Sequence, residues 1–513
     1  MSGSNIISDD QKNKLLRELI DAYYPDAAQE TDIFMQLSRE ISTLKGNRIE
    51  PSHYYSSCMP EEKFRRIYEE YQRWMKENKK LDFDDIMVYT YRLFVERPDV
   101  LQLWQNKFTY ILIDEFQDIN PIQYDIMRML SKPQDNIFIV GDDDQSIYRF
   151  RGANPELMLH FKKDFPDTKE VTLDINYRST GIIVEKAGML IRENENRFPK
   201  KIKAFAERGY ALDMSSFSTQ LEEITHCMEN IQEYISQGHE FRDVAILFRT
   251  NTGSQKMVEQ LMSWNMPFQV RDVLPNLYDH WISANIITYM KIALGSRARG
   301  DFLQIINRPN RYVSREAFYD PEVVFESLYQ FYEEKTWMCE RLEKLEHDLK
   351  VMKNMTPFGA VNYIRFGIGY EGYLKEYAQY RHLNYEELLE ILDELQDTAR
   401  GFDTVDEWFA HIERYRAEMK QQYQRKKNTE DRITVSTMHS AKGLEFDNVY
   451  ILDINEGVIP YHKAVLDAEI EEERRLFYVG MTRAKSRLHL YSVKERHGKK
   501  VEPSPFLEEI TGA

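Results

Sequence analysis

Two short apolar runs, each followed by charged residues, dominate the pattern of apolar and polar positions along the chain. The first run spans Ile111 to Ile113, and the second spans Ile137 to Val140. Each has the length of a buried parallel strand, and charged residues that follow such strands lie at the carboxyl edge of a sheet. Between the runs, Pro121 suits a first helical position, and apolar residues follow it at helical spacing. The pattern predicts strand, helix and strand, with polar groups delivered to one edge.

Further apolar runs predict more strands downstream. Val171 to Leu173 has the pattern of a third strand, and Val244 to Phe248 is apolar throughout, as expected for a buried strand. Strands are also expected around Thr434 to Ser436 and Val449 to Leu452. The sequence therefore predicts an α/β fold with parallel sheets.

Two long stretches show helical periodicity instead. In residues 1 to about 80, apolar side chains such as Leu15, Leu16 and Ile20 recur at helical spacing. From about 307 to 430 the sequence is rich in aromatic residues and shows no strand alternation or internal repeat. Both stretches predict helical subdomains.

Length and composition limit the class of protein. A chain of 513 residues is too long for one ordinary core, so two to four domains are expected. No run of about 18 apolar residues offers a membrane span, and the first residues lack the apolar core of a secretory signal. Cys58, Cys227 and Cys339 lack metal-ligand spacing and read as free thiols. We expect a cytoplasmic protein without a membrane partner.

The charge balance argues modestly against nucleic acid as a partner. There are 85 acidic and 68 basic residues, for a net charge of −17, whereas nucleic-acid-binding proteins usually carry a basic patch. A protein that binds single strands needs positive charge only along its binding channel, because stacking side chains supply much of the affinity. The net charge therefore makes nucleic-acid binding less expected but does not exclude it.

The first acidic turn carries adjacent carboxylates, Asp114 and Glu115, directly after a predicted strand. In phosphoryl transfer one such carboxylate holds Mg²⁺, and a second orients or deprotonates the attacking water. An isolated pair of this kind is more often two solvated acids at a strand end. The residues that follow in sequence favour the catalytic interpretation.

Five segments resemble, in the same order, motifs of the UvrD/Rep/PcrA-like superfamily 1A DNA helicases. DEFQD, from Asp114, resembles the Walker B motif, and GDDDQSIYRFRGA, from Gly141, resembles motif III. LDINYRS, STMHSAKGLEF and EEERRLFYVGMTRAK resemble motifs IV, V and VI, and the resemblance covers nearly the whole chain.

The resemblance implies two RecA-like (P-loop NTPase) motor domains, each with a helical insertion. The implied segments are 1–84 (first insertion), 85–180 (remainder of the first motor domain), 181–306 (second motor domain), 307–430 (second insertion) and 431–513 (end of the second motor domain, and tail). After Tyr491 we expect a short polar tail, and the ending PSPFLEEI resembles the usual close of the family, so a natural C-terminus is expected.

The implied activity is that of an ATP hydrolase that moves 3′ to 5′ on single-stranded DNA and unwinds it, in repair, recombination or replication. ATP and Mg²⁺ are the implied cofactors. Single-stranded DNA and duplex junctions are the implied partners, with repair or replication proteins in addition, and we expect a monomer. The resemblance implies catalytic roles for Asp114 (the metal ligand), Glu115, Gln145, Arg178 and Arg483, nucleotide contacts for Lys442, Gly443 and Glu445, and DNA contacts for Tyr148, Phe150, Arg151, Arg249, Asn251, Thr437 and His439.

Several of these residues also have simpler interpretations. Tyr148 and Phe150 could be core aromatics, and Phe150 stands where the family usually has tryptophan. His439 could be a satisfied loop histidine. Arg474 and Arg475, also within motif VI, could form helix-surface ion pairs with the acidic residues before them, and for Arg474 we prefer that interpretation.

No GxxxxGK[ST] sequence occurs in the chain. In the resembling family this phosphate-binding loop precedes the first helical insertion, so the first motor domain is expected to lack it. Three hypotheses follow: a fragment of an active helicase, which we favour, an ATPase-dead DNA-binding subunit, or a split motor completed by another chain. In each case we expect residues 1–513 alone to hydrolyse ATP at background.

Overall fold

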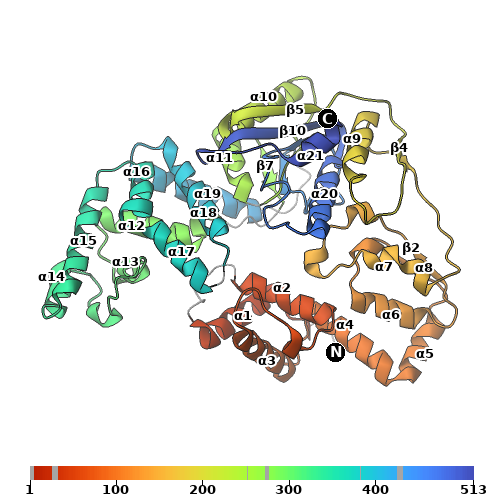
Figure 1. Cartoon of the computed structure of the whole chain (residues 1–513), viewed down its shortest axis with the longest axis horizontal. Helices are drawn as coiled ribbons and strands as arrows, with labels where there is room; N and C mark the ends of the chain where they lie inside the picture. The colour runs from red at the N-terminus through yellow and green to blue at the C-terminus, as the bar shows by residue number, and fades with distance from the viewer. Residues whose placement is uncertain are drawn as a thin grey trace. The chain divides into compact units, whose positions relative to one another are not determined.

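The computed structural model describes residues 5–25, 33–250, 252–271, 276–381, 383–424 and 431–512 (Figure 1). Two compact units divide the chain. The first consists of Met1–Gly253, Trp264–Asp272 and Glu430–Ala513, and the second of Ser254–Ser263 and Val273–Thr429. All the predicted site residues that the structure describes belong to the first unit.

The first unit begins with helices. They are α1 (Asp9–Tyr23), α2 (Ile33–Gly46), α3 (Glu61–Glu77), α4 (Phe83–Glu96) and α5 (Pro98–Lys107). The side chain of Ser8 accepts a hydrogen bond from the N–H of Gln11 and so caps α1. Apolar side chains from α1, α2 and α3, among them Leu16, Leu37 and Phe64, form one buried cluster. The expected helical character of this stretch is confirmed.

A small sheet of two parallel strands follows, formed by β1 (Ile111–Ile113) and β2 (Ile137–Ile139) with α6 (Pro121–Ser131) between them. Asn120 caps α6 in a reciprocal capping box with Gln123. One face of this sheet packs against Phe116 and other aromatic side chains. On the opposite face Leu112 and Phe138, which are register partners, are 71% and 60% exposed. The predicted strand, helix and strand are confirmed, and one sheet face is bare.

A large sheet of seven strands forms the other α/β part of the first unit. Its order is β11-β10-β9-β6-β8-β7, and β5 also pairs with β10. Every pairing is parallel except β10 with β11. The strands are β5 (Asp213–Thr219), β6 (Val244–Phe248), β7 (Phe268–Val270), β8 (Ile433–Thr437), β9 (Phe446–Ile451), β10 (Ala484–Arg496) and β11 (Lys499–Lys500). The fully buried β6 coincides with the predicted apolar run, and β8 and β9 lie where strands were expected.

Helices from distant parts of the sequence pack on this sheet. Figure 1 shows α9, α20 and α21 beside it, and their side chains share one buried cluster with β6, β9 and β10. The helices around this sheet are α9 (Gly181–Ile191), α10 (Gln220–Ser236), α20 (Asp467–Met481) and α21 (Pro505–Thr511). The expected polar tail after Tyr491 is wrong, because β10 continues to Arg496 and α21 buries Phe506 and Ile510.

The predicted third strand at Val171–Leu173 is also wrong. Val171 and Leu173 are 83% and 80% exposed, and the strand β3 begins only at Ile175–Asn176, where it pairs with β4 (Lys203–Ala204). The alternation of apolar and polar residues suits a strand, but no described segment donates hydrogen bonds beside it. An extended segment without a partner does not become part of a sheet.

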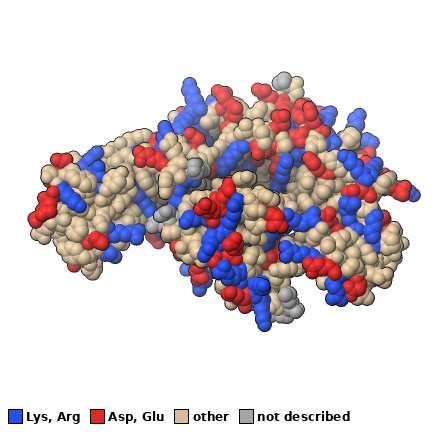
Figure 2. Space-filling model, turned by 60° about the horizontal axis from the view of Figure 1, so that its bottom comes forward, with Lys and Arg blue, Asp and Glu red and all other residues tan. Residues whose placement is uncertain are grey.

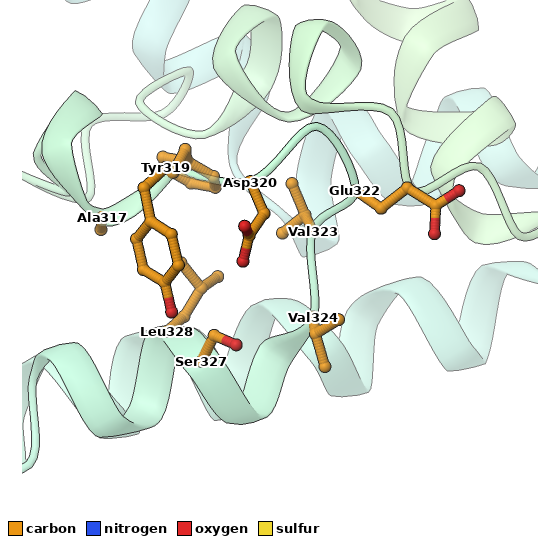
Figure 3. A pocket seen from close by; sticks show the side chains of 9 residues that line it. Ala317, Tyr319, Asp320, Glu322, Val323, Val324, Ser327 and Leu328 are labelled. Atoms are coloured by element: carbon orange, nitrogen blue, oxygen red, sulfur yellow. The ribbon is translucent and has the colours of Figure 1, made fainter.

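The second unit is helical. Its longer helices are α11 (Gln255–Ser263), α12 (Trp281–Ala293), α15 (Thr336–Met352), α17 (Tyr370–Arg381), α18 (Tyr385–Thr398) and α19 (Val405–Gln424), with the shorter α13 (Arg299–Ile305), α14 (Phe325–Phe331) and α16 (Pro357–Asn362) between them. Residues 307–424, where described, contain no strand, as expected. A small cavity lies beside α14, where Tyr319 and Asp320 face Ser327 and Leu328 (Figure 3). It is lined by none of the predicted site residues.

On the face shown in Figure 2, basic and acidic side chains are interspersed. Among the helices of the described ranges, none is long and apolar enough to cross a membrane.

Candidate motor site between two parallel sheets

The turn after β1 presents two exposed carboxylates. Asp114 and Glu115 follow the last residue of the strand, and Glu115 has a left-handed backbone with φ of 51°. The N–H of Glu115 donates to Oδ1 of Asp114 at 2.9 Å, and Nε2 of Gln117 donates to Oε2 of Glu115 at 2.6 Å. The turn thus directs both carboxylates outward from the carboxyl end of a parallel strand, and Gln117 orients the second.

Gln117 joins this turn to the one after β2. Its side chain is fully buried, and its Oε1 accepts from the N–H of Asp142 at 3.0 Å. Ser146 donates from its hydroxyl to the carbonyl of Gln117 at 3.2 Å. A Cβ on Gly141 would lie 2.6 Å from Oε1 of Gln117, so this close approach requires glycine. Gln117 was not among the predicted site residues, although it lies within the Walker B-like motif.

Lys442, from the loop after β8, reaches both turns. Its Nζ forms an ion pair with Asp118 and donates to the carbonyl of Gln145 at 2.8 Å. The ammonium also lies 4.9 Å from the centre of the Tyr148 ring, which is a cation–π distance. Its side chain is only 8% exposed. The expected nucleotide contact of Lys442 stays a prediction, and the structure adds a bridge between the small and large sheets.

Three of the residues predicted to contact DNA form one aromatic cluster. The ring centres of Tyr148 and Phe150 are 6.1 Å apart, and those of Phe150 and His439 are 5.4 Å apart, both edge to face. The hydroxyl of Tyr148 donates to the carbonyl of His439 at 3.3 Å. Phe150 is 43% exposed, whereas Tyr148 packs partly against the core of the large sheet. We call these three residues the aromatic cluster.

The other predicted DNA contacts are less accessible or lie outside the description. Thr437 is buried at the end of β8, where its hydroxyl accepts from the N–H of Ser440 at 3.3 Å. Arg151 ends a short 3-10 helix, but its side chain lies outside the description, as does all of Asn251.

Arg249 has an acidic partner. Its Nε and Nη2 donate to the two carboxylate oxygens of Glu473 at 2.8 and 2.6 Å, and its guanidinium lies 4.9 Å from the centre of the Tyr461 ring. Such a bidentate pair fixes the arginine.

Arg178 and Glu445, which the resemblance places near nucleotide, lie side by side. Nε of Arg178 donates to Oε2 of Glu445 at 2.9 Å, and Nζ of Lys485 lies 2.7 Å from Oε1. Hydrogen bonds from Lys485 and Arg178 lower the pKa of Glu445. Gly443, two residues earlier, is exposed with φ of 83°, a left-handed value that suits glycine.

Arg483 is buried, with 1% exposure. Its guanidinium donates to the carbonyls of Val479 at 2.9 Å and Leu444 at 3.1 Å, and to the hydroxyl of Thr482 at 3.1 Å. Burial, together with the positive charge of Arg178, lowers the pKa of Arg483 to about 10. Among the described residues no carboxylate forms an ion pair with it.

The surface position expected for Arg474 and Arg475 is wrong, because both side chains are buried in α20. The ion pair with a preceding acidic residue is confirmed for Arg475, which pairs with Glu471, and is wrong for Arg474. Arg474 pairs with Glu509 of α21, with both contacts at 2.8 Å, rather than with the acidic residues before it. Arg475 donates to the carbonyl of Asn196 at 2.8 Å and to Glu471 at 3.2 Å. Burial against α21 and the segment after α9 supplies these partners.

Two basic residues that no sequence motif indicated hold the motif III turn. Arg197 pairs with Asp144, and Lys200 contacts all three of the carboxylates Asp142, Asp143 and Asp144. Oxygen atoms of these three aspartates lie within 4.8 Å of one another. The ammonium of Lys200 already supplies their positive charge, so this cluster does not suit a metal ion. The pairing joins residues 53 or more positions apart, which no local pattern reveals.

The turn after β1 suits a metal better. Asp114 and Glu115 are exposed oxygen donors at the carboxyl edge of a parallel sheet, and Mg²⁺ is usually held by one or two carboxylates together with phosphates and water. The chemistry of these residues therefore fits Mg²⁺ bound to a nucleotide.

Comparison with known proteins agrees with this geometry. Residues 2–166 match the UvrD/REP helicase N-terminal domain, and residues 171–495 match the UvrD-like helicase C-terminal domain. YjcD of Bacillus subtilis is 34% identical over 459 residues, which are 86% of this chain and 59% of YjcD. The ATP-dependent DNA helicase PcrA of Staphylococcus aureus is 30% identical over 527 residues, covering 97% of this chain and 70% of PcrA. The chain spans only part of both relatives, and it belongs to the UvrD/PcrA-like helicase family.

Proposed function

We propose that this chain forms the DNA-gripping and nucleotide-sensing part of an ATP-dependent helicase that moves 3′ to 5′ along single-stranded DNA. The observation that carries the proposal is the meeting of two sheets at Lys442. This residue contacts Asp118 beside the acidic turn and the ring of Tyr148 in the aromatic cluster. A nucleotide-dependent movement of the acidic turn would therefore be transmitted through Lys442 to the aromatic cluster. The direction of movement is carried over from the family resemblance.

The aromatic cluster provides the grip. Phe150 is half-exposed at its edge, and His439 supports it edge to face. Bases stack on such rings irrespective of sequence, with about 1–3 kcal/mol per base. A motor that travels along arbitrary DNA needs this kind of contact, which also does not depend on a basic surface. Net negative charge is therefore compatible with binding to single strands.

Individual residues can be given roles in binding and hydrolysing the nucleotide. Asp114 would hold Mg²⁺, which when bound neutralises phosphate charge and orients the nucleotide. Glu115, held by Gln117, would accept a proton from the attacking water at its carboxylate. Arg178 would exchange Glu445 for the terminal phosphate, because an arginine prefers a more highly charged partner in the same geometry.

Arg483 and Gln145 complete the assignment. Arg483 bonds only neutral oxygens among its described partners, so a phosphate would be its first anionic partner there. Gln145 donates to Asp142 at 2.8 Å and would transmit the state of the nucleotide to the aromatic cluster. Its carbonyl already accepts from Lys442.

A second candidate is a DNA-binding module that does not hydrolyse ATP by itself. The sequence contains no GxxxxGK[ST] loop, and the small sheet leaves Leu112 and Phe138 bare on one face. Parallel sheets are almost always covered on both faces. We infer that further polypeptide covers this face and that the phosphate-binding loop comes with it. The complete assembly would then hydrolyse ATP.

DNA-stimulated ATP hydrolysis by residues 1–513 tests whether this chain binds and hydrolyses nucleotide without further polypeptide. We expect a background rate, equal for the wild type and for Glu115→Gln, because the sequence contains no GxxxxGK[ST] loop to hold the phosphates. A DNA-stimulated rate that Glu115→Gln abolishes would show that this chain binds and hydrolyses nucleotide unaided. Phosphate release is to be followed with and without oligo(dT), with Lys201→Ala as the matched control.

A further inference from the structure

The acidic turn after β2 is clamped by basic residues from a distant segment. Nε and Nη2 of Arg197 donate to the two carboxylate oxygens of Asp144 at 2.8 and 2.7 Å. Nζ of Lys200 forms ion pairs with Asp142 and Asp143 and lies 3.0 Å from Oδ2 of Asp144. Both basic side chains are largely buried, with 10% and 13% exposure. The turn is therefore held from one side by two cations.

The segment that carries these cations is itself fixed to α20. We call residues 194–200 the strap. Oε1 of Glu471 accepts from the N–H groups of Glu195 at 2.7 Å and Asn196 at 3.1 Å, and Arg475 donates to the carbonyl of Asn196 at 2.8 Å. Nη1 of Arg474 donates to Oδ1 of Asn194 at 2.6 Å. The strap is thus bonded to the helix that carries motif VI.

From the clamped turn, hydrogen bonds continue to both functional groups. The N–H of Asp142 donates to Gln117, which in turn donates to Glu115 at 2.6 Å. In the other direction, Asp142 accepts from Gln145 at 2.8 Å, and the chain then passes through the fully buried Ile147 to Tyr148. A shift of the turn would therefore move a carboxylate on one side and the aromatic cluster on the other.

We propose that Arg197 and Lys200 are positioning residues, which hold the Asp142–Asp144 turn in register with α20 and thereby place Glu115 and Tyr148. Neither touches a reacting group. The strap gives the chain a direct structural link between the motif VI helix and the motif III turn. This inference rests on the proposed function only where it assigns roles to Glu115 and Tyr148.

Affinity for single-stranded DNA tests the proposal, measured by fluorescence anisotropy with labelled oligo(dT). Lys200→Ala should weaken binding by about tenfold, because the placement of a stacking ring is lost. Lys201→Ala removes the same charge from the next, exposed position and should weaken binding by no more than about twofold. Lys200→Arg keeps the cation and should restore most of the affinity.

Asp144→Asn gives a test of opposite sign. It removes a negative charge, so electrostatics alone would strengthen DNA binding. The strap predicts weaker binding instead, because Arg197 loses the carboxylate that fixes the turn. Tighter binding by Asp144→Asn, or equal binding by Lys200→Ala and Lys201→Ala, would overturn the proposal.

Amide hydrogen exchange decides the question independently of DNA. In Lys200→Ala the amides of residues 141–150 should exchange at least about tenfold faster than in the wild type, while those of β6 keep their protection. In Lys201→Ala both regions should be unchanged. Unchanged exchange of residues 141–150 in Lys200→Ala would refute the role of the strap, whether or not the wild type binds DNA. A wild type that binds no DNA would instead count against the proposed function.

Discussion

The ammonium of Lys442 and the carboxylate of Asp118 form an ion pair that joins the loop after β8 to the turn after β1. The two side chains are 8% and 19% exposed. Burial raises the pKa of Asp118, and the hydrogen bond and charge of Lys442 oppose that rise. A single unpaired charge at this partly buried position would be costly, so each side chain requires the other. The pair therefore links the small sheet to the large sheet.

We predict that Lys442→Met destabilises the first unit by about 2–4 kcal/mol, because it leaves Asp118 partly buried without its cation. The double variant Lys442→Met with Asp118→Asn should recover about half of that loss. Urea unfolding of the wild type, Lys442→Met, Asp118→Asn and the double variant measures the coupling. Lys201→Met, at an exposed site, serves as the control, and additive losses in the double variant would contradict the bridge.

The two arginines assigned to the terminal phosphate should differ in their effect on stability. Arg178→Ala breaks a pair in which the side chains are 33% and 47% exposed, so it should cost less than about 1 kcal/mol. Arg483→Ala removes a buried guanidinium that donates to three oxygens, and it should cost about 3 kcal/mol or more. Equal losses of stability for Arg178→Ala and Arg483→Ala in urea unfolding would contradict the buried, hydrogen-bonded position of Arg483.

Stability of the second unit should fall in mildly acidic solution because of His280. This residue caps α12, where its Nδ1 accepts from the N–H of Ile282 at 3.3 Å. Burial lowers the pKa of His280 to about 4, so the unfolded state takes up the proton first as the pH falls below the ordinary value near 6.5. The contribution is complete above that value and is lost between about pH 6.5 and 4.

His280→Asn keeps a capping acceptor but cannot titrate, so it should lose less stability across this pH range. The expected difference in the free energy of unfolding between pH 7 and pH 4 is at most roughly 3 kcal/mol. Parallel pH profiles for the wild type and His280→Asn would show that the histidine is solvated.

The sequence predicted those parts of the fold that local patterns determine. The apolar runs at β1, β2 and β6 coincide with strands, apart from Val140, which lies just after β2. Pro121 begins α6, as its preference for the first helical position predicts. The strand predicted at Val171–Leu173 is absent because a strand also requires a hydrogen-bonded neighbouring strand, and the periodicity of a sequence does not show whether one exists. Phe506 and Ile510 were assigned to a tail because their burial depends on α9 and α20, which lie far away in the sequence.

The candidate site shows the same division. Motif resemblance selected Tyr148, Phe150 and His439, which the structure brings together, although their contact with DNA stays a prediction. The clamp formed by Arg197 and Lys200 was missed, because its partners are 53 to 58 residues away and neither residue lies in a recognised motif.

The most direct test of the account is the affinity of residues 1–513 for single-stranded DNA. We predict that Tyr148→Ala and Phe150→Ala each weaken oligo(dT) binding by about 5- to 100-fold, the loss of one stacked base. Phe150→Trp should bind at least as tightly as the wild type. Tyr210→Ala, which removes an exposed ring outside the aromatic cluster, should have no effect. Equal affinities for the wild type, Tyr148→Ala and Phe150→Ala would contradict the assignment of the aromatic cluster as the DNA grip.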